Sequence, residues 1–163
     1  MTTKAYSGSC HCGDVKYQIR LTIPPMTEIG FDGDLENDFI VTSPANIEDV
    51  EIGWYFCKRC GVRTFGMGGD WVSEEIDVAK WAGKEDGDGK VQKVFKTTAR
   101  TDGAKGYDGK GLHYVSANGT TLDEIDLIEA HDNGWIFYVE NKYKKEGEYP
   151  QMRFKEPFKG GCY

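Results

Sequence analysis

The chain has 163 residues, of which 39% are hydrophobic and 13% aromatic. This is enough apolar surface for one folded domain and excludes an intrinsically disordered chain. The net charge of -7 disfavours attraction to nucleic-acid phosphates or anionic lipids, and no apolar run approaches the roughly 20 residues of a membrane helix. The start of the chain has no signal-peptide pattern, so we expect a cytoplasmic protein with no nucleic-acid or membrane partner.

Strands dominate the predicted elements. Residues 14–22 alternate apolar and polar side chains, which is typical of a half-buried strand. Short β-branched or aromatic runs bounded by turn residues predict further strands at 39–42, 52–56, 62–65, 91–95 and 135–139. Helix is expected only at 73–81 and 122–130, and the second stretch also fits a strand.

Turn residues separate these runs. The segment 85–90 and the pairs Asp108-Gly109, Asn118-Gly119 and Asn133-Gly134 contain residues that tolerate positive φ. The Gly-, Lys- and Asp-containing stretch 99–111 is expected to form a surface loop. The prediction is a mainly β protein of antiparallel strands, organised as a single domain over residues 1–163.

Four of the five cysteines form two closely spaced pairs, Cys10 with Cys12 and Cys57 with Cys60. Two cysteines two or three residues apart can direct both sulfurs at one point, and a second such pair completes a tetrahedral site of four sulfurs. Thiolates of this kind select zinc or iron. We therefore expect one structural zinc ion per chain, closed by four protein ligands, whose binding contributes to folding.

These cysteines also allow two other interpretations. Cys57 and Cys60 also fit a redox pair, but such a pair opens a helix after a strand, whereas a strand is expected to follow here. His11 could replace one sulfur, although adjacent side chains in extended backbone point in opposite directions.

The two cysteine segments carry a resemblance to a known family. Residues 8–17, GSCHCGDVKY, and residues 56–66, FCKRCGVRTFG, resemble the two zinc motifs of the family of glutathione-dependent formaldehyde-activating enzymes and centromere protein V. The resemblance covers residues 6–69. It implies an Mss4-like fold of packed antiparallel sheets around a structural zinc held by Cys10, Cys12, Cys57 and Cys60. Residues 70–163 contain further strand-like runs and are expected to continue the same sheets.

The chain departs from the family between the two motifs. Members acting on glutathione adducts carry a further Cys-x-Cys-x-x-Cys cluster there for a catalytic zinc, and residues 13–56 contain neither Cys nor His. Two hypotheses follow, with no catalytic residue identified for either. The first is a zinc-stabilised binding or scaffold module, and the second is a carbon–sulfur lyase whose partner is a small thiol such as glutathione.

Several further residues could carry chemistry. The acidic segments 31–38 and 86–89 could bind calcium, but they lack the length of a calcium loop and fit turns better. His113 and His131 are candidate general bases, with surface or half-buried imidazoles as the alternative. The aromatic residues could line a pocket or fill the core; they are Phe31, Trp54, Trp71, Trp81 and Trp135.

Cys162, the fifth cysteine, lies outside these two pairs. It weakly resembles the carboxy-proximal nucleophile of B-type methionine sulfoxide reductases, which share the Mss4-like fold. Those enzymes bind zinc through two Cys-x-x-Cys pairs, whereas this chain begins with Cys-x-Cys.

Overall fold

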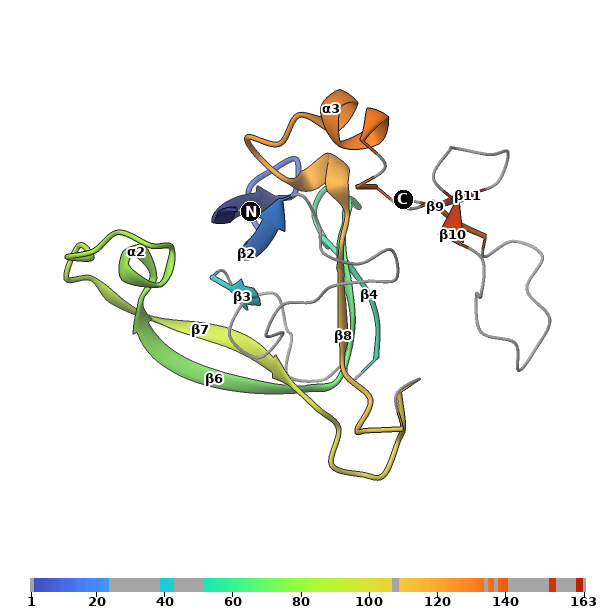
Figure 1. The fold of residues 1–163 in the computed structure, drawn as a ribbon. Helices are drawn as coiled ribbons and strands as arrows, with labels where there is room; N and C mark the ends of the chain where they lie inside the picture. Colours follow the sequence, from blue (N-terminus) through green and yellow to red (C-terminus); the bar gives the residue numbers. More distant parts are fainter. Residues whose placement is uncertain are drawn as a thin grey trace. The chain divides into compact units, whose positions relative to one another are not determined.

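The structure is a computed structural model that describes residues 2–23, 39–42, 52–106, 109–133, 135–136, 138–140, 153–154 and 161–162. Its contacts divide the chain into two compact units, Met1–Glu124 and Ile125–Tyr163. The described elements are mainly strands paired in antiparallel fashion, which confirms the predicted mainly β class (Figure 1). Among the described residues, no helix has the length and apolar character needed to cross a membrane.

The first unit contains two antiparallel sheets. The larger has the order β1-β2-β3-β7-β6, with strands Thr2–Ser9, Lys16–Ile23, Phe39–Val41, Val91–Thr98 and Asp70–Asp77. The smaller has the order β4-β5-β8, with strands Ile52–Phe56, Arg63–Gly68 and Tyr114–Ala117. The strands predicted at 14–22, 39–42, 52–56, 62–65 and 91–95 are therefore present.

The core of this unit is an aromatic cluster between the two sheets. The Phe65 ring from β5 lies 5.6 Å from Tyr17 and 5.2 Å from Phe39, both from the larger sheet. On its own sheet it stacks at 4.9 Å on Tyr55. Because side chains alternate along a strand, these inward residues leave their neighbours on the outer faces.

The helix predicted at 73–81 is wrong over most of its length. Strand β6, Asp70–Asp77, pairs residue by residue with β7, and only the four residues of α2, Val78–Trp81, are helical. The backbone hydrogen bonds of an eight-residue antiparallel ladder override the weak local preference of this segment for helix. The turn between β6 and β7 includes 85–90, as predicted.

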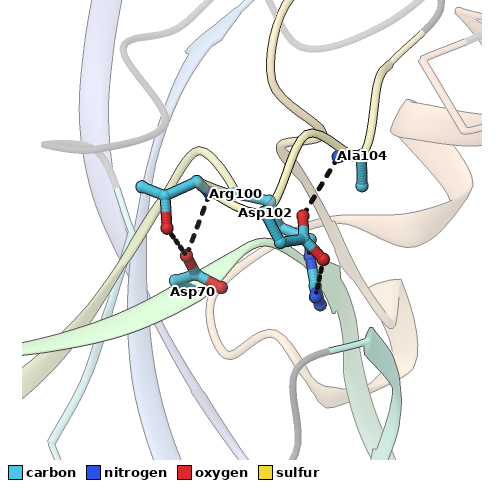
Figure 2. A network of polar contacts seen from close by, with 5 residues as sticks. Asp70, Arg100, Asp102 and Ala104 are labelled. Carbon is cyan, nitrogen blue, oxygen red and sulfur yellow. Dashed lines mark hydrogen bonds and ion pairs between the residues drawn. The ribbon is translucent and has the colours of Figure 1, made fainter.

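The loop that follows β7 is held by polar contacts (Figure 2). Arg100 forms an ion pair with Asp102, and the Asp102 carboxylate also accepts the backbone N–H of Ala104 at 3.0 Å. Asp70, at the start of β6, accepts both the N–H and the hydroxyl of Thr101 at 3.3 Å. These carboxylates thus fix the described part of the predicted surface loop to the end of the β6–β7 hairpin.

The second unit contains helix α3, Leu127–Asp132, and a small sheet of order β10-β9-β11. The Asp126 side chain begins α3 by accepting the N–H groups of residues 128 and 129, both at 2.9 Å. The stretch 122–130, for which helix and strand were both predicted, is helical only from Leu127 onward. The last element of the first unit is a 3-10 turn, η1, at Gly119–Thr121. The small sheet comprises β9, Tyr138–Glu140, β10, Arg153–Phe154, and β11, Gly161–Cys162, so the strand predicted at 135–139 begins three residues later than expected.

Candidate metal centre

The four predicted cysteines lie on two turns that are built alike. One turn connects β1 to β2 and carries Cys10 and Cys12, and the other connects β4 to β5 and carries Cys57 and Cys60. Strand pairing ends at Ser9↔Lys16 in the first hairpin and at Phe56↔Arg63 in the second, so each turn has six residues and begins with a cysteine.

Each turn is closed by the same backbone hydrogen bond. The N–H of Cys10 donates to the carbonyl of Val15 at 3.0 Å, and the N–H of Cys57 donates to the carbonyl of Val62 at 2.9 Å. Each turn also contains one glycine at positive φ, which lets the chain reverse without the steric cost that a side chain would bring. Two like turns therefore present their cysteines in a defined geometry.

The cysteine sulfurs form one compact cluster. The Sγ atom of Cys12 lies 3.6 Å from that of Cys10 and 3.5 Å from that of Cys57, and all four Sγ atoms lie within 4.8 Å of one another. All four are free thiols. Cys10 and Cys57 are buried, and Cys12 and Cys60 are half-buried. These four thiols lie close enough to bind one metal ion.

The thiols perturb one another. Burial opposes ionisation of Cys10, but the N–H of Val15, 3.3 Å from its sulfur, and the neighbouring thiols outweigh it and lower the Cys10 pKa to about 6. The Asp14 backbone favours the Cys12 thiolate, but burial and the neighbouring sulfurs raise the pKa of Cys12 to about 12. Four close sulfurs cannot all carry negative charge without a compensating cation, which is what a bound metal ion supplies.

Two side-chain and backbone features around the cluster were not anticipated from the sequence. The Val15 N–H donates to the Cys10 sulfur, and Arg59 in the second turn forms an ion pair with Asp14 in the first at 3.3 Å. Both partners of this pair are exposed, so it adds little stability. The spacing Cys-x-x-x-x-Val, common to both motifs, was the available signal for two equal turns.

The histidines do not belong to the group of clustered ligand atoms among the described residues. His11 is exposed in the first turn and is not among the clustered ligand atoms of the described residues. His113 Nε2 lies 3.0 Å from the buried Thr97 hydroxyl, and His131 Nδ1 lies 3.0 Å from the Tyr138 hydroxyl in the second unit. The imidazoles of His113 and His131 are thus half-buried, and each has a hydroxyl partner. This fits the predicted alternative to a general base.

The acidic segments give no metal cluster among the residues that the structure describes. Segment 31–38 lies outside those residues. In the turn at 86–89, the N–H groups of Asp88 and Gly89 donate to the Asp77 carboxylate at 3.1 and 2.9 Å, as the turn interpretation requires. Cys162 lies in β11, and its side chain is outside the described part of the chain.

The described tryptophans have different surroundings. Trp71 packs against the core and donates its indole N–H to the Tyr55 hydroxyl at 2.7 Å. The Trp81 ring lies under the Arg20 guanidinium at 4.3 Å. Trp54 is exposed and Trp135 is half-buried, and Phe31 is not among the described residues.

Comparisons of this chain with family models, with curated proteins and with solved structures find no match.

Proposed function

We propose that the cysteine cluster binds one zinc ion per chain and that the ion is structural. The observation that carries this proposal is the approach of four free sulfurs from two separate hairpins to within 4.8 Å of one another. Zinc–sulfur bonds of about 2.3 Å in a tetrahedron require sulfurs about 3.8 Å apart. The distances of 3.5 and 3.6 Å from Cys12 to its neighbours need only a small expansion to fit.

The position of the cluster supports a structural role. One turn connects two strands of the larger sheet, and the other connects two strands of the smaller sheet. Cys10 and Cys57 belong to the hydrophobic core cluster between the two sheets. A metal ion bound by both turns cross-links the two sheets. Its binding free energy then becomes part of the folding free energy.

The function that fits best is a zinc-stabilised binding or scaffold module. The motif resemblance to the glutathione-dependent formaldehyde-activating enzyme and centromere protein V family supports a shared structural site in an Mss4-like fold. The lack of Cys and His in residues 13–56 supports the loss of the thiolate-bound catalytic zinc. The module would therefore act by binding a partner.

Metal content is the first test. Native mass spectrometry of the chain produced with added zinc should find one zinc ion per chain, and Cys12→Ser should lose or weaken it. Cys162→Ser is the matched control, because this cysteine is outside the proposed ligand set, and it should keep the full zinc content. Two zinc ions per chain, or equal retention by both variants, would contradict the proposal.

Two further measurements separate structural from catalytic zinc. Complete removal of the ion by a chelator should abolish the native circular dichroism, and its survival would exclude a structural role. Calorimetry with glutathione, together with an assay of glutathione adducts, tests the rival function. Saturable binding with turnover of an adduct would replace the scaffold proposal with that of a carbon–sulfur lyase.

A further inference from the structure

The four thiols of the metal centre differ in their access to solvent. The buried residues Cys10 and Cys57 are each 2% exposed, whereas Cys12 and Cys60 are half-buried. A cysteine that binds zinc is held as the thiolate, which is the form that reacts with oxidants, and access to solvent then decides which thiolates are oxidised. Two of the four proposed zinc ligands are therefore open to a reagent dissolved in water.

Cys12 combines this access with two close sulfur neighbours. Its Sγ atom lies 3.6 Å from that of Cys10 in the same turn and 3.5 Å from that of Cys57 in the other turn. A cysteine oxidised to sulfenic acid condenses with a nearby thiol to a disulfide. Oxidised Cys12 thus has two possible partners, and a bond to Cys57 would join the two hairpins.

The two partners differ in the ring that a disulfide would close. Between Cys10 and Cys12 there is one residue, in a turn held by a 3.0 Å hydrogen bond from the Gly13 N–H to the Cys10 carbonyl. A disulfide needs a dihedral angle of about 90° at its sulfurs, and so short a ring in a fixed turn strains it. Cys57 is 45 positions from Cys12 and belongs to a separate turn, so a bond to it escapes this constraint and closes a long loop, which favours the folded chain.

We propose that Cys12 is an oxidation site for hydroperoxides and that the product is a Cys12–Cys57 disulfide, which takes over from the zinc ion the link between the two hairpins. Hydrogen peroxide is the simplest reagent of this class. The inference rests on the proposed structural zinc site and adds a modification that controls whether the site holds its ion.

The reaction balances in two steps. The Cys12 thiolate attacks one peroxide oxygen, the O–O bond breaks and hydroxide leaves, which gives the sulfenic acid of Cys12. The Cys57 thiolate then attacks the Cys12 sulfur and expels a second hydroxide. The two sulfurs lose two electrons, and the peroxide, with two protons from solvent, becomes two water molecules. Cys10 and Cys60 are left as ligands, too few for a closed zinc site, and the ion is released.

The test is a titration of the zinc-loaded full chain with hydrogen peroxide. A chromophoric indicator reports the released zinc, and the intact mass reports the loss of two hydrogen atoms per disulfide. We expect one disulfide for each zinc ion released, and reversal of both changes by a phosphine reductant with added zinc. The oxidised chain should keep more native circular dichroism than the reduced, chelated chain, because the disulfide still joins the hairpins. Cys162→Ser, which lacks the fifth thiol, should behave like the parent chain.

Trypsin distinguishes the possible disulfides, because it cuts inside the second motif. Free thiols are first blocked with N-ethylmaleimide in acid. Cleavage after Lys58 and Arg59 then places Cys57 and Cys60 on different peptides. A disulfide within the second turn would therefore join these two peptides.

The first motif stays on one tryptic peptide, residues 5–16. The expected disulfide joins this peptide to the one that carries Cys57, and fragmentation on either side of His11 shows whether Cys10 or Cys12 forms the bond. A Cys10–Cys12 bond would instead leave the peptide unlinked and lighter by two hydrogen atoms.

Two matched variants test whether Cys12 is the sulfur that reacts. Histidine also binds zinc in closed sites with three cysteines, so Cys12→His and Cys60→His each keep four ligands and remove one accessible sulfur. Cys12→His should form no disulfide between the hairpins and should release zinc several-fold more slowly than Cys60→His, which keeps the reacting pair. Where a variant fails to hold zinc, the disulfide map of the parent chain decides.

The proposal is overturned if zinc is retained in a large molar excess of peroxide, if the main disulfide is not Cys12–Cys57, or if zinc leaves with sulfinic acid and no disulfide. Equal zinc release from the two histidine variants would also overturn it. These results leave the structural zinc proposal standing when one ion per chain is present before peroxide is added. An absence of zinc at that point contradicts the zinc proposal, and this inference with it.

Discussion

The hydroxyl of Tyr17 lies 2.7 Å from the hydroxyl of Thr121, a residue 104 positions later in the chain, and both side chains are buried. The Thr121 Oγ1 atom is also 2.8 Å from the Asn118 carbonyl, to which it donates. This chain of hydrogen bonds ties strand β2 of the larger sheet to the η1 turn that follows β8 of the smaller sheet.

Removing the Tyr17 hydroxyl should destabilise the first unit modestly. Tyr17→Phe keeps the ring in the aromatic core but deletes one buried hydrogen bond, while Thr121 retains the Asn118 carbonyl as its acceptor. We expect the free energy of unfolding to fall by about 1 kcal/mol in urea denaturation. Tyr114→Phe is the control: Tyr114 is exposed, its hydroxyl has no hydrogen-bond partner among the described residues, and the loss of this hydroxyl should have almost no effect. Equal stability of Tyr17→Phe and the parent chain would show that this hydrogen bond contributes nothing.

The same tyrosine predicts an alkaline limit to stability. Burial, only partly offset by the Thr121 hydrogen bond, raises the pKa of Tyr17 from 10.0 to about 12. Because the folded-state pKa is the higher one, this stabilisation is complete below pH 10 and is lost as the pH rises toward 12. The free energy of unfolding of the parent chain should fall by up to about 2–3 kcal/mol over this pH range because Tyr17 ionises in the unfolded state.

Comparison with Tyr17→Phe isolates this contribution. The variant has no ionisable group at this position, so the difference in unfolding free energy between the two proteins should shrink and then reverse between pH 10 and 12. Both proteins contain the same other tyrosines, whose effects cancel. A difference that stays constant with pH would refute the assignment.

Acid should weaken the turn between β6 and β7 through Asp77. Its carboxylate accepts the N–H groups of Lys80, Gly89 and Asp88 at 3.0, 2.9 and 3.1 Å, and these bonds, that from Lys80 first, lower the Asp77 pKa. A lowered folded-state pKa means that the stabilisation is present above the ordinary carboxyl pKa and is lost as the pH falls through the folded-state value.

Asp77→Asn measures this effect, because it keeps an acceptor oxygen and removes the charge. The stability advantage of the parent chain over Asp77→Asn should decrease as the pH falls from neutral into the range of carboxyl titration. Asp86→Asn, at an exposed residue of the same turn, is the matched control variant. In hydrogen exchange, Asp77→Ala should speed exchange of the Lys80 and Gly89 amides; unchanged rates would mean that the carboxylate does not hold the turn.

Local patterns were sufficient for the features that depend on one segment at a time. The alternation in residues 14–22 identified β2 because every second side chain, such as Tyr17 and Ile19, is buried in one core. The four cysteines could be grouped from spacing alone, since a six-residue turn keeps two sulfurs on the same side of each hairpin.

Features that depend on pairing between distant segments could not be predicted from local sequence patterns. Residues 73–77 have a weak local preference, and only the β7 partner makes them a strand. The close contact of two β5 glycines with the rings of Trp54 and Tyr114 was also missed. Gly66 and Gly68 resemble turn glycines in sequence, and their role becomes evident only when β4 and β8 place rings over them.

This glycine role gives the last prediction, which concerns Gly68 and Tyr114. A Cβ atom at position 68 would lie 2.3 Å from the Tyr114 ring, so Gly68→Ala forces the ring off the strand. We expect a loss of about 1–3 kcal/mol in the free energy of unfolding, the usual cost of overpacking. In a Tyr114→Ser background the clash is absent, and the same Gly68→Ala change should cost much less. Equal costs in both backgrounds in this double-mutant cycle would mean that the Tyr114 ring does not rest on Gly68.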